Sequence, residues 1–199
     1  MSAAGAAVGF TVKSGWAAAV LVAGTAASPR VADSRIIELS DPNIPETRQP
    51  YHAGFGTARK DGRELSRLLD LVRRRGTQSV SAAIAAYRDG GHRLAGAALV
   101  VGSTIDPDRI ANEHIRIHAL EGQLFRSVIE DVVTNSGFAC RLWRQRDLYS
   151  LAARTLQRSE QDLRHALVEL RPAGRTAWRA EHKDAALAAW LVLSTGPRS

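Results

Sequence analysis

The chain has 199 residues, of which 45% are hydrophobic and 24% are charged, and its formal net charge is +7. This composition supplies enough apolar side chains for one folded domain and excludes an intrinsically disordered chain. The charge is uneven, because residues 141–183 hold ten basic and five acidic side chains. A basic surface favours polyanions, so DNA or RNA is a candidate partner, although many proteins without such a partner are also basic.

The cysteine content and the apolar runs bear on the cellular compartment. Cys140 is the only cysteine, so an internal disulfide is excluded and a reducing compartment fits. Residues 16–23 follow Lys13 and fit either a signal peptide or a hairpin strand, and the short run favours the hairpin. No stretch reaches the roughly 20 apolar residues of a membrane helix. We therefore expect a cytoplasmic protein without a membrane partner, either a monomer or a dimer.

The first forty residues predict three strands. Residues 8–14 alternate in polarity, Ser14-Gly15 is a turn signal, and residues 16–23 form a second apolar run. After a break at residues 25–29, residues 30–39 predict the third strand. Three consecutive strands joined by short turns are typical of an antiparallel meander.

Residues 41–60 differ from the rest, because they contain three prolines and show no hydrophobic period. We expect a long irregular loop, and such segments are usually functional or mobile. Its centre combines aromatic, histidine and glycine residues, namely Tyr51, His52, Gly54, Phe55 and Gly56. The pattern fits a surface loop with aromatic side chains on the core, or a ligand-binding loop in which Tyr51 and His52 contact substrate.

Two helices and a strand are predicted next. Asp61 and Glu64 form a capping box for a helix that ends at Gly76, and a second helix covers residues 79–88. Residues 94–101 are a nearly continuous apolar run between glycines. Such a run is typical of a strand that is buried on both faces.

The longest helix is expected over residues 106–133. Asp106 is a favourable N-cap, Pro107 suits the first helical position, and residues 135–137 supply a C-terminal stop. An apolar stripe follows the helical period and consists of Ile110, Ile117, Leu120, Leu124, Val128 and Val132.

His114, His118 and Glu121 lie on the edge of this stripe, where polar side chains are costly unless they meet partners. Their spacing places all three on one helical face. They could therefore hold a divalent metal, as zinc or iron ligands or with magnesium as the ion. The alternative is a buried hydrogen-bond cluster that fixes helix and loop, with His52 or Lys13 as partner.

Two further groups could contact phosphate. Glu113 and Arg116 lie off that helical face, either as a solvated pair or as a substrate contact. Near a strand predicted over residues 138–143, cations are mixed with an aromatic side chain, the group being Arg141, Trp143, Arg144 and Arg146. This mixture is typical of nucleic-acid surfaces, and it also suits a strand end that keeps the protein soluble.

The remaining residues, 146–199, are predicted to be helical. The expected organisation is one domain over residues 1–199, with an irregular loop at residues 41–60 and this helical C-terminal part. The order β-β-β-α-α-β-α-β-α-α-α implies a mixed sheet with helices on both faces.

Three segments resemble a known family. Residues 8–17, which include Gly15-Trp16-Ala17, are similar to the first hairpin of ribonuclease H-like proteins, in particular the Holliday-junction resolvases. Residues 118–126 are similar to the long helix of these proteins, and residues 181–190 to their final helix. The resemblance implies an α/β fold with a five-stranded mixed sheet, in which a three-strand antiparallel meander is joined by two parallel strands.

The resemblance also implies clustered carboxylates that hold two metal ions. The family pattern has an acid near Gly9 to Thr11 and another at the end of the fourth strand, but this chain has neither. Only Glu181 and Asp184 match, as catalytic candidates, while Lys13 and Arg144 are candidates for substrate binding. We therefore expect a catalytically degenerate protein that binds nucleic acid. The alternatives are a divergent metal-dependent nuclease or phosphodiesterase with a displaced site, and a structural interaction protein.

Overall fold

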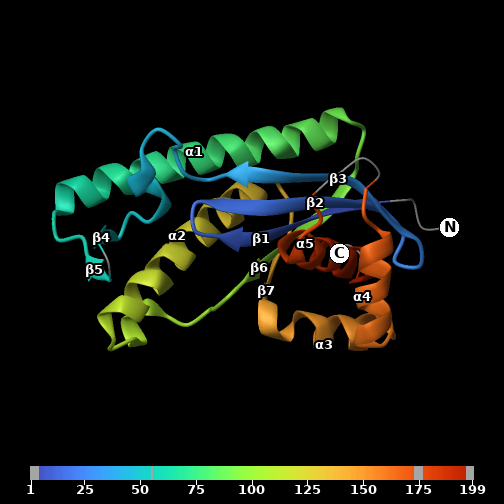
Figure 1. Ribbon diagram of the computed structural model, residues 1–199. Helices are drawn as coiled ribbons and strands as arrows, with labels where there is room; N and C mark the ends of the chain where they lie inside the picture. The colour runs from blue at the N-terminus through green and yellow to red at the C-terminus, as the bar shows by residue number, and fades with distance from the viewer. Residues whose placement is uncertain (1–4, 55, 173–176, 196–199) are drawn as a thin grey trace.

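The computed structural model describes residues 5–54, 56–172 and 177–195. Its main sheet has the strand order β3-β2-β1-β6-β7 (Figure 1). The strands are β1 Gly5–Lys13, β2 Trp16–Gly24, β3 Pro29–Glu38, β6 Leu94–Val101 and β7 Cys140–Arg144. The first three are antiparallel, whereas β6 is parallel to both β1 and β7. The predicted meander with two added parallel strands is therefore confirmed.

The hairpin of β1 and β2 is the centre of the sheet. Gly15 has a φ of +82°, which a glycine adopts without steric cost, and it closes the turn between Lys13 and Trp16. All residues of β2 between its two ends are buried. Residues 16–23 are thus a strand of the core, as the hairpin interpretation predicted.

Helices cover both faces of the sheet (Figure 1). On one face lie α1 (Gly62–Asp89) and α2 (Glu113–Asn135), which pack against one set of strand side chains, including Phe10 and Leu99. On the other face lies α5 (Ala180–Thr195), with α3 (Gln145–Leu156) and α4 (Glu160–Glu169) beside it. In the described residues, no helix is long and apolar enough to cross a membrane.

The two helices predicted at residues 61–76 and 79–88 are one continuous helix, so this prediction is wrong. Helix α1 runs without a break through Gly76, which is fully inside the helix and buried. A Cβ atom at Gly76 would lie 2.5 Å from Cγ1 of Val128 on α2. The glycine therefore permits close approach of the two helices and does not end one of them.

The start predicted for the longest helix is also wrong. Asp106 and Pro107 cap only a short 3-10 helix, Pro107–Arg109, after which Ile110 is extended. Helix α2 begins at Glu113, because the side chain of Asn112 accepts the backbone N–H of Ile115 at 3.0 Å. The predicted stop holds, since α2 ends at Asn135 and Gly137 has a φ of +83°.

The segment 41–60 is less irregular than expected. It contains a 3-10 helix, Pro45–Arg48, and a small antiparallel sheet of β4 (His52–Gly54) and β5 (Thr57–Ala58). Phe55 lies outside the described residues. Figure 1 shows this hairpin beside the N-terminal end of α2, so His52 is carried towards His114 and His118.

Candidate functional site

Asp184 occupies the α5 side of the sheet, at the end where β1 and β7 finish. Its side chain is buried, and Nε2 of Gln145, the first residue of α3, donates a hydrogen bond of 2.7 Å to Oδ2 of Asp184. Burial raises the pKa of Asp184, while Gln145 and the charge of Lys13 oppose the rise and Glu181 adds to it. Lys13, the last residue of β1, therefore approaches Asp184 as a cation.

Close packing leaves no room for a second acid at Gly9. A Cβ atom there would lie 1.9 Å from the carbonyl oxygen of Ala185, the residue after Asp184. Strand β1 and helix α5 are thus in backbone contact at Gly9, within the range Gly9 to Thr11 where the family resemblance implies a carboxylate. The described residues that act on Asp184 include an amide, two cations, the hydroxyl of Tyr149 and the half-buried Glu181. This arrangement differs from a cluster that holds two metal ions.

The raised pKa of Asp184 predicts how stability changes with pH. The folded state holds the proton of Asp184 more tightly than the unfolded state does. The contribution of this proton to the free energy of unfolding is therefore complete below the unfolded pKa of Asp184 and is lost as pH rises through its folded pKa. Asp184→Asn keeps the acceptor for Gln145 and removes the buried charge. We expect its free energy of unfolding at pH 7 to exceed that of the unsubstituted chain by on the order of 1 kcal/mol.

Urea unfolding of both proteins between pH 4 and pH 8 measures this difference, which should shrink towards acid pH. Asp70→Asn is the control, because Asp70 is exposed on α1. A loss of stability at pH 7 in Asp184→Asn would mean that the ionised carboxylate stabilises the fold and would contradict the prediction.

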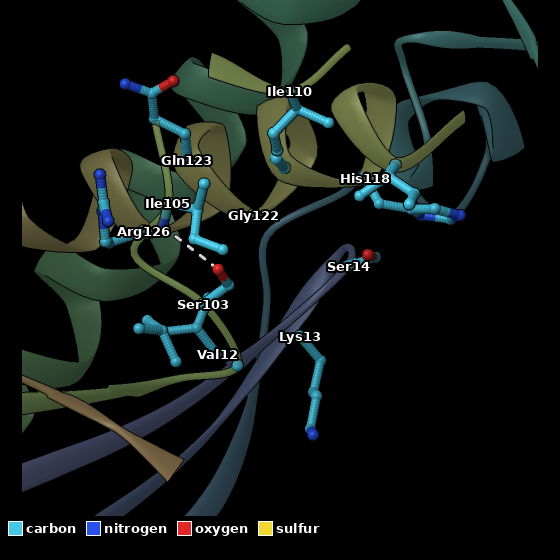
Figure 2. A pocket seen from close by; sticks show the side chains of 14 residues that line it. Val12, Lys13, Ser14, Ser103, Ile105, Ile110, His118, Gly122, Gln123 and Arg126 are labelled. Carbon is cyan, nitrogen blue, oxygen red and sulfur yellow. Dashed lines mark hydrogen bonds between the residues drawn. The ribbon is translucent and has the colours of Figure 1, made fainter. Parts of the chain in front are cut away.

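A cavity of about 380 Å³ lies between the ends of β1 and β6 and the first half of α2. Its polar lining includes Lys13, Ser103, His118, Gln123 and Arg126, and no acidic residue (Figure 2). In Figure 2 the side chain of Lys13 runs away from Ser103 and Gln123, consistent with its approach to Asp184 on the other face. His118 and Arg126 stand on opposite sides of this view.

Three histidines meet beside the cavity. Each of His52, His114 and His118 offers one nitrogen, and these three atoms all lie within 4.8 Å of one another. Nε2 of His118 is 3.3 Å from Nε2 of His114, and the ring centroids of His52 and His118 are 4.9 Å apart. Burial, together with the charges of His52 and His114, lowers the pKa of His118 and favours its neutral form.

Glu121 lies beneath the histidines and is completely buried. Its Oε1 accepts a hydrogen bond of 2.7 Å from Nδ1 of His52, and its Oε2 is 3.9 Å from Nδ1 of His118. Burial raises the pKa of Glu121, while the hydrogen bond with His52 and the backbone of Tyr51 oppose the rise. The structure thus places Glu121 behind the imidazoles.

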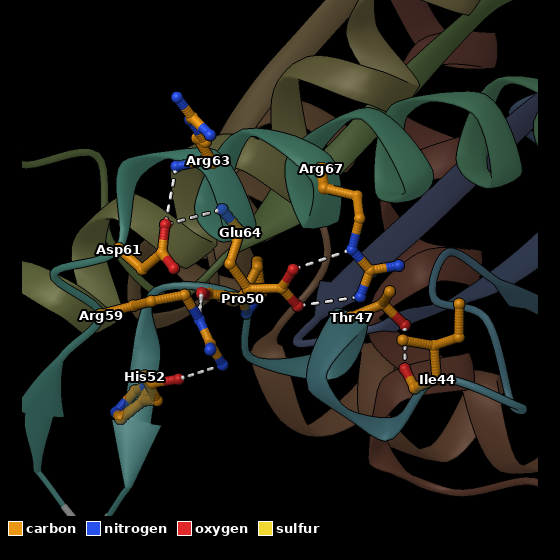
Figure 3. A network of polar contacts seen from close by, with 9 residues as sticks. All are labelled: Ile44, Thr47, Pro50, His52, Arg59, Asp61, Arg63, Glu64 and Arg67. Carbon is orange, nitrogen blue, oxygen red and sulfur yellow. Dashed lines mark hydrogen bonds and ion pairs between the residues drawn. The ribbon is translucent and has the colours of Figure 1, made fainter.

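Arg59 holds the hairpin that presents His52. Its Nε donates to the carbonyl of Pro50 at 2.9 Å, and its NH2 group donates to the carbonyl of His52 at 2.8 Å (Figure 3). At the start of α1, Asp61 accepts the backbone N–H groups of Arg63 and Glu64. These contacts fix the loop at both ends of the hairpin.

The other candidates are not members of the three-histidine group. Glu113 and Arg116 are exposed in the first turn of α2, and Arg144 ends β7 in an ion pair with Asp147. Tyr51 is half-buried, and burial raises the pKa of its hydroxyl. Sequence reasoning did not single out Gln145 or Arg59, because neither belongs to a motif.

Cys140 does not supply a nucleophile. Burial, with the charge of Glu130, raises the pKa of this thiol to about 12. A thiol with such a pKa carries almost no thiolate at neutral pH.

The overall fold has solved counterparts. No protein-family model and no curated protein sequence matches the chain. A structure of Thermus thermophilus RuvC in complex with Holliday junction substrate aligns with 94% of this chain and 91% of its own, at 11% identity and a TM-score of 0.56. A second structure of that RuvC covers 94% and 92%, at 10% identity and a TM-score of 0.57. The chain therefore has a ribonuclease H-like fold that resembles RuvC.

A more distant likeness exists to a Ppx/GppA family protein of Aquifex aeolicus. It covers 77% of this chain and 40% of that chain, with 10% identity and a TM-score of 0.40.

Proposed function

We propose that this ribonuclease H-like chain binds nucleic acid through its basic surface and does not perform two-metal nuclease chemistry. The observation that carries the proposal is the side chain of Lys13, which ends β1 and lines the cavity at this end of the sheet. A two-metal site needs carboxylates there to hold the ions, whereas a lysine suits a phosphate. The RuvC structure of similar fold contains a Holliday junction substrate, which supports DNA as the partner.

Cations near the end of β7 belong to the same basic surface. Arg144 and Arg146 follow one another closely at this strand end, and their side chains are 42% and 71% exposed. Both pair with Asp147, so two positive charges share one negative charge. Because β1, β6 and β7 are neighbouring parallel strands, these arginines and Lys13 lie at the same end of the sheet.

The remaining candidates take supporting roles in this proposal. Arg116 extends the basic surface along α2, with Glu113 as its solvated neighbour. Tyr51 packs against the core and supports the hairpin. Asp184 accepts the hydrogen bond of Gln145, Glu181 adds negative charge beside it, and in this proposal neither carboxylate holds a metal. The single cysteine supports a reducing compartment such as the cytoplasm.

Binding of a labelled four-way DNA junction, measured against salt concentration, tests the proposal. We expect affinity to fall steeply as salt rises, because each neutralised phosphate releases counterions. Lys13→Gln and Arg146→Gln should each weaken binding and lower the salt slope by about 1. Arg73→Gln is the matched control, because Arg73 is exposed on α1, which covers the face of the sheet opposite α5.

Two results would overturn the proposal. The first is the absence of salt-dependent affinity for junction, duplex and single-stranded DNA or RNA. The second is an equal loss in the Arg73→Gln control, which would mean that only net charge matters. Magnesium-stimulated cleavage of the junction would overturn the part that excludes two-metal chemistry.

A further inference from the structure

The three-histidine cluster is built from two segments that are far apart in the sequence. His114 and His118 are one turn apart near the start of α2, and His52 begins β4. The backbone of Gly56, with a φ of +71°, covers His114, since a Cβ there would lie 3.4 Å from Nδ1 of His114. The small hairpin is therefore folded onto the helix at the imidazoles.

The nitrogen atoms have the spacing of a metal site. A tetrahedral zinc ion with bonds of about 2.0–2.1 Å places two ligand atoms roughly 3.3 Å apart. The Nε2 atoms of His114 and His118 are 3.3 Å apart. The third nitrogen belongs to a set contained within 4.8 Å, so a small side-chain rotation brings His52 onto the same ion.

Glu121 decides which nitrogen of His52 remains for a ligand. It accepts a hydrogen bond from Nδ1 of His52, which leaves Nε2 of that ring for coordination. Its second oxygen faces Nδ1 of His118, whose Nε2 is turned to His114. A carboxylate that orients the imidazole from behind is the usual support of a histidine–metal bond.

Glu121 is buried with one of its two carboxylate oxygens lacking a hydrogen bond from the described residues. Oε2 forms no hydrogen bond with any described residue, although the side chain is 0% exposed. A buried carboxylate is costly unless it is well paired.

We propose that His52, His114 and His118 bind one divalent transition-metal ion of the zinc class, with Glu121 holding the imidazole of His52. Here Glu121 is a positioning residue and His52 is the third ligand. Three protein ligands leave a fourth coordination position free for water or substrate. His118 also lines the cavity of about 380 Å³, so that position is beside space for a small ligand. The ion can enter from solvent, because the side chain of His118 is 47% exposed.

Zinc titration of the untagged full chain, after removal of metal with a chelator, tests this site. We expect one zinc ion per chain by calorimetry, and His52→Ala, His114→Ala and His118→Ala should each weaken binding by at least about 100-fold. Glu121→Gln keeps all three ligands and should weaken binding by roughly 10–100-fold. His165→Ala is the control, because His165 is exposed on α4 and pairs with Glu169.

Two further readouts separate a ligand from a structural residue. Cobalt bound to the unsubstituted chain should give the intense visible absorption of a tetrahedral ion, and His118→Ala should lose it. Zinc should raise the melting temperature of the unsubstituted chain and of His165→Ala equally, and that of His118→Ala much less at the same zinc concentration. Failure to bind one ion, or equal binding by His118→Ala and His165→Ala when both are folded by circular dichroism, overturns the proposal. The DNA measurement is independent of this result.

Discussion

Gly9→Ala is expected to destabilise the protein by at least about 4 kcal/mol, or to prevent folding at 37 °C. The added Cβ would lie 1.9 Å from the carbonyl oxygen of Ala185 and 3.0 Å from the backbone nitrogen of Ala189. Both are backbone atoms of α5, so no side-chain rotation relieves the overlap. The whole helix would have to move away from β1, and the buried side chains of both elements would lose their packing.

Gly5→Ala is the matched control for this prediction. Gly5 is on the same strand, β1, but its added Cβ would make ordinary contacts of 3.9 Å with Ala95 and Leu193. It should be neutral or more stable by up to about 1 kcal/mol. Guanidinium unfolding of the three proteins gives the comparison. Similar stability in Gly9→Ala and Gly5→Ala would show that β1 and α5 are not in close contact.

This contact also bears on function. Gly9→Asp would restore an acid to the strand position where the family resemblance implies one, but it carries the same Cβ overlap. Position 9 therefore cannot hold a carboxylate while α5 stays in place. The loss of two-metal chemistry in the proposed function has a packing reason, in addition to the presence of Lys13 near Asp184.

Gly76→Ala is expected to lower the free energy of unfolding by about 1–2 kcal/mol, the balance of two opposing effects. Alanine in a helix interior gains up to about 1 kcal/mol over glycine. The new Cβ would lie 2.5 Å from Cγ1 of Val128 and 3.5 Å from Cδ2 of Leu39. Overpacking of a dense core typically costs about 1–3 kcal/mol, so the steric cost exceeds the helix gain.

Gly122→Ala in α2 separates the two effects, because nothing lies within 4 Å of a Cβ at this position. It should be more stable than the unsubstituted chain by up to about 1 kcal/mol. Val128→Ala combined with Gly76→Ala should show a favourable coupling energy, since the smaller side chain removes the overlap. Urea unfolding of the unsubstituted chain, Gly76→Ala, Gly122→Ala, Val128→Ala and the double variant measures these differences. A gain of stability in Gly76→Ala alone would mean that α1 and α2 pack more loosely than described.

The two candidate sites lie on opposite faces of the sheet. Asp184 is among the helices of the α5 face, whereas the histidines are on α2 and the β4–β5 hairpin. The cavity is lined both by His118, which belongs to the histidine site, and by Lys13, which belongs to the nucleic-acid site. The two sites therefore meet at the end of β1. A bound nucleic acid and a bound metal would therefore be near one another without sharing ligands.

Local patterns in the sequence were sufficient for the five strands of the main sheet. Alternation and short turns predicted the β1–β2 hairpin, and the continuous apolar run predicted β6 at its observed bounds, Leu94–Val101. Short connections predicted the antiparallel neighbours β1, β2 and β3. The β-α-β alternation that follows predicted the strands that make the sheet mixed. The N-cap of α4 is also formed by residues close in sequence, because the hydroxyl of Ser159 accepts the backbone N–H of Asp162.

Sequence reasoning failed where a residue serves a distant partner. Gly76 has the sequence signature of a helix end, and only Val128 on another helix shows why a glycine is needed there. Asp106 and Asn112 are both suitable N-caps, and the extended backbone at Ile110 decides between them. Local propensity differs by about 1 kcal/mol between such choices, which tertiary contacts easily exceed.

The histidines illustrate the same division. The sequence alone determined that His114, His118 and Glu121 share one face of a helix, because helical geometry fixes that spacing. The tertiary structure decided that His52, which is 69 residues before Glu121, completes the group and that Glu121 lies behind it. The folding of β4 onto α2 depends on the hydrogen bonds of Arg59 and on packing across the core, and neither leaves a periodic signal in the sequence.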